Sequence, residues 1–301
     1  MNELSLLLKQ LNSLILGKST EVKLAVVCVL ARGHLLLEDL PGVGKTTLAH
    51  GLAVALGLDF RRVQFTNDML PADLLGATIF NPNDGKFVFK PGPVFHRFLL
   101  ADEINRASPK VQSALLEAME EQQVSIDGQT YALPKPFIVV ATQNPNEQIG
   151  TFALPESQLD RFLMRISIGY PVDKSEKYLY LHGSRREVVN KIQAVFNANT
   201  LQAIQQKVAN MPLSESIIDY VYRLVNATRV DGMFLQGLSP RAGLALIQAA
   251  KAHAFIENRD VVLPEDVQAV FVAVAAHRLK TLQHGSNSIS VLKDLLHNIS
   301  V

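Results

Sequence analysis

The sequence from residue 36 to residue 47 reads Leu36-Leu37-Glu38-Asp39-Leu40-Pro41-Gly42-Val43-Gly44-Lys45-Thr46-Thr47. An apolar strand runs into a tight glycine loop, and the loop opens a helix that we expect over residues 46–56. Small residues let main-chain N–H groups turn inward onto phosphates, and the helix N-terminus adds partial positive charge. The pattern predicts a triphosphate cradle made of Pro41, Gly42, Val43, Gly44, Lys45, Thr46 and Thr47.

Two side chains of this loop carry the expected chemistry. Lys45 can reach the β- and γ-phosphates, and the Thr46 hydroxyl suits Mg²⁺. One position departs from the usual motif, because Asp39 stands where the first glycine is expected. Gly42 and Gly44 still supply the sharp turn. A loop of this composition formed by chance is the alternative, and the strand-to-helix setting argues against it.

A second apolar run, Phe98-Leu99-Leu100-Ala101-Asp102-Glu103, ends in two carboxylates. Asp102 could hold Mg²⁺ through water, and Glu103 could polarise an attacking water. Acidic strand ends are common on protein surfaces, so this motif gains its meaning from the glycine loop that precedes it.

A third strand, in Val139-Val140-Ala141-Thr142-Gln143-Asn144-Pro145, ends in polar residues. The carboxyl ends of parallel strands meet at one edge of a sheet, where ligands bind. Asn144 would then lie near the γ-phosphate and help to orient water. An Asn before Pro is also an ordinary turn residue.

Two arginines are candidates for stabilising charge during phosphoryl transfer. Arg161 directly precedes the last expected strand, and Arg241 lies in the first turn of a later helix. An arginine finger contributes about 10³–10⁵ in rate. The alternative for each is a surface salt bridge with Asp160 or another carboxylate, which stabilises little. Spacing alone leaves both readings open.

The first part of the chain alternates strand and helix patterns, which predicts an α/β parallel sheet covered by helices. The expected strands are Leu35–Glu38, residues 62–65, Phe98–Asp102, residues 137–142 and residues 163–168, and one helix is expected over residues 108–122. After about Pro171 only helical patterns remain. We therefore predict a nucleotide-binding domain over residues 1–185 and a helical domain over residues 186–301, with the boundary inside residues 172–195.

Turn signals indicate two β-hairpins inside the first domain. Asn83-Asp84-Gly85 can turn within residues 78–94, and Asp127-Gly128 is a strong two-residue turn within residues 123–133. Each hairpin could be stabilising decoration, or it could contact a substrate or a neighbouring subunit.

Composition describes an ordinary globular protein, with 48% hydrophobic and 19% charged residues and a formal net charge of +1. A protein that grips nucleic acid through phosphates is usually more basic. The single cysteine, Cys28, excludes an intrachain disulfide and fits a reducing cytoplasm. The N-terminus makes a poor signal peptide, and no apolar run approaches the ~18 residues of a membrane span. We therefore expect a soluble cytoplasmic protein.

Taken together, these segments resemble the AAA+ ATPases and, more narrowly, the MoxR family. The similarity covers nearly the whole chain. It lies in Gly33-His34-Leu-Leu-Leu-Glu-Asp-Leu-Pro-Gly-Val-Gly-Lys-Thr, Ala101-Asp-Glu-Ile-Asn-Arg-Ala, Ala153-Leu-Pro-Glu-Ser-Gln-Leu-Asp-Arg-Phe and Leu238-Ser-Pro-Arg-Ala.

The resemblance implies a role for each candidate residue. It implies a Walker A loop at Gly42 to Thr46, a Walker B pair at Asp102 and Glu103, sensor 1 at Asn144, an arginine finger at Arg161 and sensor 2 at Arg241. Residues 78–94 resemble the helix-2 insert, and residues 123–133 resemble the hairpin before sensor 1.

Further implications concern the adenine pocket and the subunit interface. Leu16-Gly17-Lys18 resembles the stretch that lines the adenine pocket, with Lys18 in place of the usual Gln or Glu. Arg106 resembles an interface arginine, with a surface ion pair as the alternative. In this clade the lid is repositioned, so Arg241 can serve a neighbouring subunit.

The resemblance implies a homo-oligomeric ring of six subunits that hydrolyses ATP with Mg²⁺ and remodels a protein client, often with a partner that carries a von Willebrand factor A domain. Three alternatives stay open: a magnesium-chelatase-like motor subunit, a nucleic-acid motor, and a nucleotide-gated scaffold with low turnover. Glu103 argues against the scaffold. The absence of Lys and Arg from residues 122–132 argues against a phosphate track.

Overall fold

The structure, a computed structural model, describes residues 3–83, 85–145, 150–171, 173–183, 187–230, 232–282 and 288–300. Its centre is a five-stranded sheet in the order β2-β5-β8-β1-β9, and every neighbouring pair is parallel. The strands are β1 (Leu35–Glu38), β2 (Phe60–Gln64), β5 (Phe98–Asp102), β8 (Ile138–Gln143) and β9 (Met164–Ile166). The predicted parallel sheet is confirmed.

The last strand is shorter than the sequence predicts. β9 ends at Ile166 instead of residue 168, because the Ser167 hydroxyl and the Gly169 N–H donate to the Asp39 carboxylate. β2 also differs, since it begins at Phe60, which pairs with Phe98 of β5.

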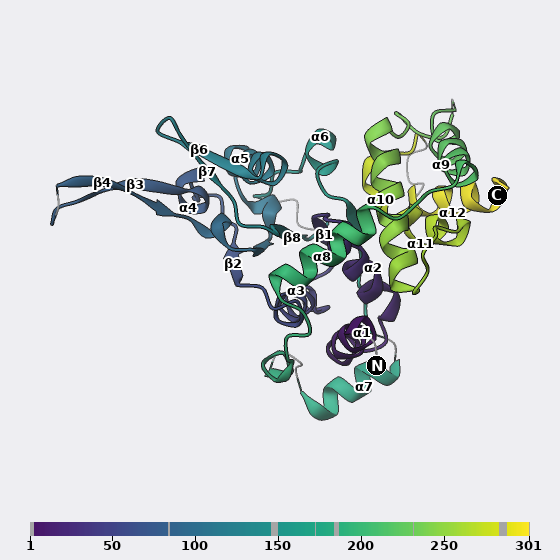
Figure 1. The fold of residues 1–301 in the computed structure, drawn as a ribbon, viewed down its shortest axis with the longest axis horizontal. Coiled ribbons are helices and arrows are strands. Elements are labelled where there is room, and N and C mark those ends of the chain that lie inside the picture. The colour runs from purple at the N-terminus through teal and green to yellow at the C-terminus, as the bar shows by residue number, and fades with distance from the viewer. Residues whose placement is uncertain are drawn as a thin grey trace.

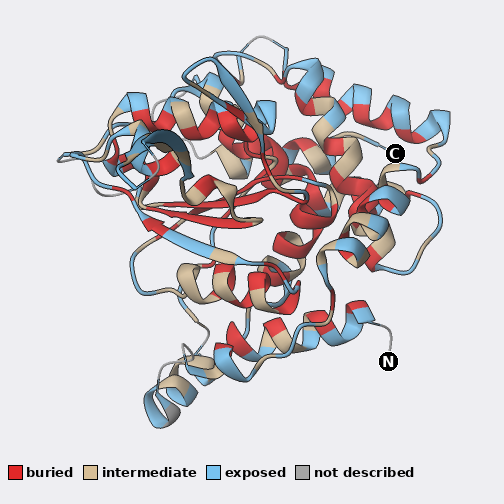
Figure 2. Cartoon of the chain, turned by 60° about the vertical axis from the view of Figure 1, so that its left-hand side comes forward, coloured by how far each residue is buried: buried red, intermediate tan, exposed pale blue. Residues whose placement is uncertain are grey.

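Both faces of the inner strands β1, β5 and β8 are buried, as their continuous apolar runs predict. Leu35 and Leu37 belong to one apolar cluster and Leu36 to the other, because successive side chains of a strand point to opposite faces. Figure 2 shows the buried strands between layers of helix.

Two sets of helices cover the sheet. The first face carries α1 (Glu3–Leu14), α2 (Ser19–Leu30) and α3 (Lys45–Ala55), whose apolar residues share a cluster with Leu35 and Leu37. The second face carries α4 (Pro71–Leu75) and α5 (Pro109–Glu121). In α1, Leu4, Leu7, Leu11 and Leu14 are buried at helical spacing, so this helix is part of the domain core.

Beyond β9 the described elements are helical, apart from an isolated bridge between Phe234 and Thr281. They are α7 (Asp173–His182), α8 (Ala198–Ala209), α9 (Glu215–Ala227), α10 (Pro240–Ile256), α11 (Pro264–Ala275) and α12 (Ser288–Asn298), and a short α6 (Glu156–Leu159) precedes β9. The apolar cluster of the first sheet face continues into them. The predicted boundary between residues 185 and 186 lies outside the described residues and stays a prediction.

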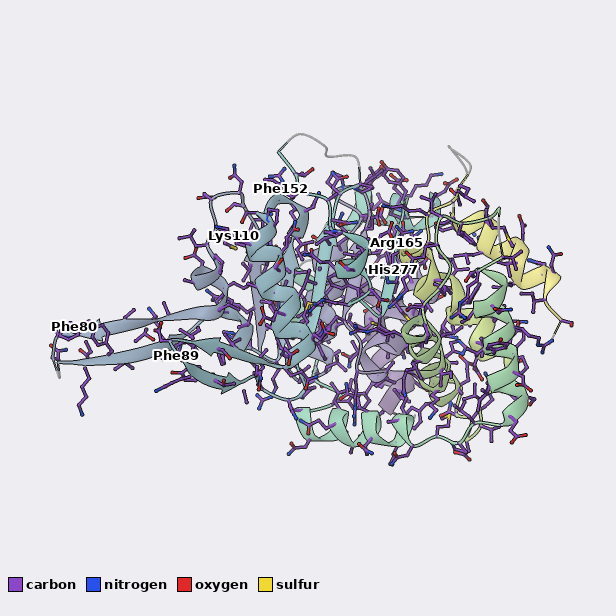
Figure 3. All side chains as sticks on the ribbon, turned by 90° about the horizontal axis from the view of Figure 1, so that it is seen from above. Phe80, Phe89, Lys110, Phe152, Arg165 and His277 are labelled. Atoms are coloured by element: carbon purple, nitrogen blue, oxygen red, sulfur yellow. The ribbon has the colours of Figure 1, made fainter. Side chains whose placement is uncertain are left out.

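Two antiparallel hairpins extend from the first part: β3 (Gly76–Asn81) with β4 (Lys86–Pro91), and β6 (Gln123–Ile126) with β7 (Gln129–Ala132). The first hairpin projects far from the body, with Phe80 near its end and Phe89 closer to the base (Figures 1 and 3). Asp84 of its expected turn lies outside the described residues. The two hairpins are in contact, because the rings of Phe89 and Tyr131 stack with centroids 4.0 Å apart.

Within the described ranges, no helix is both long and apolar enough to cross a membrane.

Candidate functional site

A cavity of about 510 Å³ lies at the carboxyl edge of the sheet. This edge is where ligands bind in parallel α/β sheets. The cavity is lined by Leu14, Ile15, Leu16, Lys18, Pro41, Gly42, Val43, Gly44, Lys45, Thr46, Thr47, Arg62, Gln64, Asp102, Glu103, Thr142, Gln143, Asn144, Ile168, Gly169, Pro171, Leu179 and Gly183. The seven predicted phosphate-loop residues are therefore brought together with Asp102, Glu103 and Asn144.

The glycine loop has the backbone that a phosphate cradle requires. Gly42 has a φ of 85° and Gly44 a φ of 103°, values that residues with a side chain rarely adopt. A Cβ on Gly42 would meet nothing within 4 Å, so the backbone conformation, and not crowding, requires glycine there. α3 begins directly after the loop, at Lys45, and its first N–H groups have no partner within the helix.

Lys45 folds back onto its own loop, where its ammonium donates to the backbone carbonyls of Asp39 and Leu40, the latter at 3.0 Å. These carbonyls hold the lysine at the cavity wall. A phosphate that enters the cavity would offer the Lys45 ammonium a charged acceptor in place of these neutral carbonyls. Hydrogen bonds between two charged groups are stronger than those to a neutral carbonyl.

Asp39, the departure from the usual motif, has a structural task. Its buried carboxylate accepts hydrogen bonds from the Leu40 N–H at 2.8 Å, the Ser167 hydroxyl at 3.0 Å and the Gly169 N–H. It thus joins the start of the loop to the segment that follows β9. Gly169 also lines the cavity, so Asp39 fixes two of the cavity walls relative to each other.

Asp102 and Glu103 lie at the end of β5, next to the loop. Asp102 accepts from the Thr142 hydroxyl at 2.6 Å and from two nitrogens of Arg62 at 2.9 and 2.7 Å. Glu103 has a φ of 58°, an uncommon conformation for a residue with a side chain. Its carboxylate accepts from Gln64 at 2.6 Å and pairs with Arg106 at 3.1 Å.

Three of these partners were missed in the sequence: Arg62, Gln64 and Thr142. The parallel register places Gln64 beside Asp102, and it pairs Ala101 with Ala141, one residue before Thr142. Thr142 carries a signal that could have been used, since it is the first polar residue at the end of an apolar strand. Arg62 and Gln64 carry none, because their strand is an exposed edge strand on which polar side chains are ordinary.

The other predicted residues differ in their relation to the cavity. Asn144 lines it, as expected. Leu16 and Lys18 also line it, while Gly17 itself is not among the described lining residues. Arg106 forms an ion pair with Glu103 of the same chain, in agreement with the surface ion pair that the sequence left open as its alternative role. Both side chains of this pair are partly exposed.

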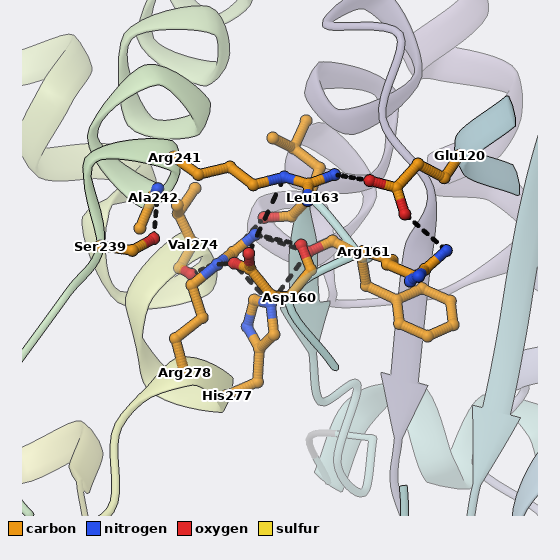
Figure 4. A network of polar contacts seen from close by, with 11 residues as sticks. Glu120, Asp160, Arg161, Leu163, Ser239, Arg241, Ala242, Val274, His277 and Arg278 are labelled. Atoms are coloured by element: carbon orange, nitrogen blue, oxygen red, sulfur yellow. Dashed lines mark hydrogen bonds and ion pairs between the residues drawn. The ribbon is translucent and has the colours of Figure 1, made fainter. Parts of the chain in front are cut away.

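Arg161 and Arg241 lie away from this cavity, at the opposite edge of the sheet. Met164 of β9 pairs with Leu35 at the start of β1, so Arg161 precedes the amino ends of both strands. The phosphate loop follows the carboxyl end of β1, about 10 Å further along the strand at its usual rise per residue. The two arginines meet at Glu120, at 2.6 Å from Arg161 and 3.1 Å from Arg241 (Figure 4).

Arg161 is also held by the Leu116 carbonyl, at 2.6 Å. Arg241 lies 3.8 Å from Asp160. The surface salt bridges considered from the sequence thus exist in the single chain. They also gather two cations on one face, next to the helical part of the molecule.

The cavity residues fit ATP with Mg²⁺. Thr46 and Asp102 both line the cavity, and the hydroxyl and carboxylate oxygens that they carry are the kind of ligand that Mg²⁺ takes from proteins. Both oxygens of Asp102 already accept a hydrogen bond, and the Arg62 guanidinium beside them supplies positive charge. Asp102 is therefore suited to holding a hydrated cation and less suited to direct ligation.

Comparison with known proteins agrees with this geometry. Residues 34–164 match the model of the ATPase family associated with various cellular activities, AAA, and residues 226–295 match an AAA lid domain. A crystal structure of a candidate ATPase from Cytophaga hutchinsonii superposes with a TM-score of 0.89 at 37% identity, over 99% of this chain and 94% of the other. The fold and the site together define an AAA+ P-loop protein with a helical lid.

Two bacterial relatives narrow the family. The chaperone MoxR1 of Mycobacterium tuberculosis is 42% identical over 90% of this chain and 74% of its own length. The uncharacterised YeaC of Bacillus subtilis is 42% identical over 90% of this chain and 85% of its own. The chain belongs to the MoxR family of AAA+ ATPases.

Proposed function

We propose that this chain hydrolyses ATP at sites shared between neighbouring subunits of a homo-oligomeric ring, six-membered by family resemblance. One observation carries the proposal. The phosphate loop, Asp102, Glu103 and Asn144 surround one cavity, whereas Arg161 and Arg241 lie at the opposite edge of the same sheet. Arg161 and Arg241 therefore cannot reach the transferred phosphoryl group of their own subunit. We propose that they supply positive charge to the site of the next subunit.

In the proposed reaction, the loop N–H groups and Lys45 hold the β- and γ-phosphates. Glu103 accepts a proton from the attacking water, and Asn144 orients that water. Arg161 and Arg241 of the adjacent subunit stabilise the charge that develops on the equatorial oxygens. Bound Mg²⁺, for which Thr46 and Asp102 are the candidate protein contacts, neutralises phosphate charge.

Two neighbours hold Glu103 in the arrangement described above. Its Oε2 accepts a hydrogen bond from Gln64 and forms an ion pair with Arg106. Both contacts are made to this one oxygen, so they orient the carboxylate toward the cavity that Glu103 lines.

The output that we propose is chaperone-like remodelling or maturation of a protein client, in the cytoplasm. The name of the M. tuberculosis relative supports this role, and the exposed hairpin β3–β4 offers a surface for contact. A partner with a von Willebrand factor A domain is proposed from family resemblance alone.

The test is phosphate release by the purified protein over a range of protein concentrations. Activity per subunit should rise with concentration as rings assemble. Glu103→Gln should bind a fluorescent ATP analogue normally and lose about 10²–10⁴-fold in turnover. Hydrolysis at the wild-type rate in that variant would remove Glu103 from the mechanism. Assembly on ATP without phosphate release in the wild-type protein would favour the nucleotide-gated scaffold.

The client can be sought with the same variant. Glu103→Gln in ATP should hold its client, and the protein that co-purifies only in ATP identifies the partner. Recovery of nucleic acid instead of protein would favour a nucleic-acid motor.

A further inference from the structure

A buried arginine lies at the joint between the helical part and the sheet. Arg278 ends the short turn η4 (Ala276–Arg278), which follows α11 directly. Its side chain is only 6% exposed. Burying a guanidinium is costly unless its N–H groups find acceptors, so the contacts of Arg278 show what it is built to hold.

Those contacts lie on both sides of Arg161 in the chain. The Arg278 guanidinium donates to the Asp160 carboxylate at 2.6 Å and to the carbonyls of Asp160, Phe162 and Leu163 at 3.2, 2.8 and 3.2 Å. It also donates to the Val274 carbonyl in the last turn of α11. One planar group thus ties the end of α11 to the turn that carries Arg161 (Figure 4).

Neighbouring charges continue the same network. Asp160 also lies 3.8 Å from Arg241, and Glu120 pairs with both Arg161 and Arg241. Three guanidiniums therefore alternate with two carboxylates, which leaves one positive charge in excess. The side chain of Arg278 is buried, whereas those of Arg161 and Arg241 are 28% and 57% exposed and can face a neighbour.

The residue beside Arg278 does not share its charge. His277 is buried, with Nε2 2.9 Å from the Phe162 carbonyl. The pKa of His277 lies well below its usual value, mainly because the ring is buried and secondly because the Arg278 charge is close by. Burial also lowers the pKa of Arg278, against the opposing effect of Asp160, and a guanidinium stays protonated at neutral pH. Arg278 is thus the charged anchor of this turn.

We propose that Arg278 is a positioning residue for Arg161: it fixes the turn at residues 160–163 from the helical domain, so that Arg161 reaches the nucleotide of the neighbouring subunit. The inference rests on the proposed shared site. Its physical basis is geometric, because a catalytic group that is displaced by about 1 Å can lower the reaction rate about 10²-fold. It also means that a movement of α11 moves Arg161, which links the helical domain of one subunit to catalysis in the next.

The first test separates kcat from nucleotide affinity. Arg278→Lys keeps the charge, but a single ammonium cannot span the carboxylate and the four carbonyls that the planar guanidinium reaches. We expect kcat to fall about 10²-fold with ATP affinity unchanged, as for a misplaced Arg161. Loss of ATP affinity with unchanged kcat would contradict the inference.

The second test uses mixed rings, because a donor defect and an acceptor defect complement each other. Arg278→Lys subunits should retain a competent phosphate site, and Glu103→Gln subunits should retain a competent Arg161. In an equal mixture about one quarter of the interfaces pair an intact phosphate site with an intact Arg161, so the mixture as a whole should recover about one quarter of the wild-type rate. Arg278→Lys mixed with Arg161→Ala should recover nothing, since both are defective donors.

The mixture of Arg161→Ala with Glu103→Gln separates the two proposals. No recovery in that mixture would refute the shared site itself. Recovery there, without recovery for Arg278→Lys with Glu103→Gln, would refute the positioning role alone. Thermal melting and size-exclusion chromatography show whether Arg278→Lys folds and assembles. If it does not, Asp160→Asn takes its place, because it weakens the ion pair between Arg278 and Asp160 from the side of the carboxylate. It must behave as a donor defect in the same mixtures, and failure to do so overturns the inference.

Discussion

The Thr142 hydroxyl donates to Oδ1 of Asp102 at 2.6 Å, and it also accepts the Glu103 N–H at 2.9 Å. One side chain from β8 therefore orients both acidic residues of β5. Thr142 is completely buried, so no solvent can take over either bond.

Thr142→Val should remove this support with little change in shape. We expect a 10–100-fold loss in ATP turnover, the usual effect of losing a partner that orients a metal-site carboxylate. Steady-state phosphate release as a function of Mg²⁺ concentration measures it. Thr142→Ser keeps the hydroxyl and should stay near the wild-type rate; a loss in Thr142→Ser together with a wild-type rate in Thr142→Val would show that the methyl packing matters and the hydroxyl does not.

Lys45→Ala should weaken ATP binding about 10–100-fold, because a hydrogen bond to a charged group contributes about 1.5–3 kcal/mol. Fluorescence titration with an ATP analogue measures the change. Lys23→Ala is the matched control, since Lys23 pairs with Glu257 on the surface and does not line the cavity. Wild-type affinity in Lys45→Ala would refute the phosphate cradle.

Asp39→Asn should destabilise the protein by about 1–3 kcal/mol, because the amide group turns a donor toward buried N–H groups that need an acceptor. Urea unfolding measures the change. Ser167→Ala removes one of the three bonds to Asp39 and should cost less, about 1 kcal/mol. ATP affinity should fall in Asp39→Asn as well, since Gly169 lines the cavity. A larger loss of stability in Ser167→Ala than in Asp39→Asn would contradict the bridging role.

His34 makes stability depend on pH. It is buried, its Nδ1 accepts the Val139 N–H at 3.0 Å, and burial lowers its pKa to about 4 from 6.5. Between pH 6.5 and 4 the unfolded chain therefore binds the proton that the folded chain refuses. The stabilising contribution is complete above pH 6.5 and is lost as pH falls toward 4, by about 3 kcal/mol in total.

Urea unfolding of the wild type and of His34→Asn from pH 7.5 to 4.5 tests this. The variant should be less stable at pH 7.5 but should lose less stability on acidification. His297→Asn, at an exposed position on α12, serves as the control for adding an asparagine. An identical pH slope in the wild type and His34→Asn would contradict the assignment.

Much of the fold could be predicted from local sequence. Glycine at positions 42 and 44 permits the positive φ values that the loop adopts, and apolar runs such as Leu35–Glu38 predict strands buried on both faces. When a strand, a glycine loop and a helix follow one another directly, the main-chain N–H groups of the loop point toward the site where a phosphate binds. The presence of Lys45, Asp102, Glu103 and Asn144 around one cavity follows from parallel strands ending at one edge.

The tertiary structure decided which residues surround this set. Arg62, Gln64 and Thr142 join the acidic pair only through the register between neighbouring strands. Asp39 became a bridge because β9 ends beside it, and Arg278 became the anchor of the Arg161 turn because α11 packs against β9. A sequence pattern encodes the backbone of a segment through steric and hydrogen-bonding rules that act over a few residues. Contacts between segments far apart in the chain depend on how complete elements pack, and no local pattern carries that information.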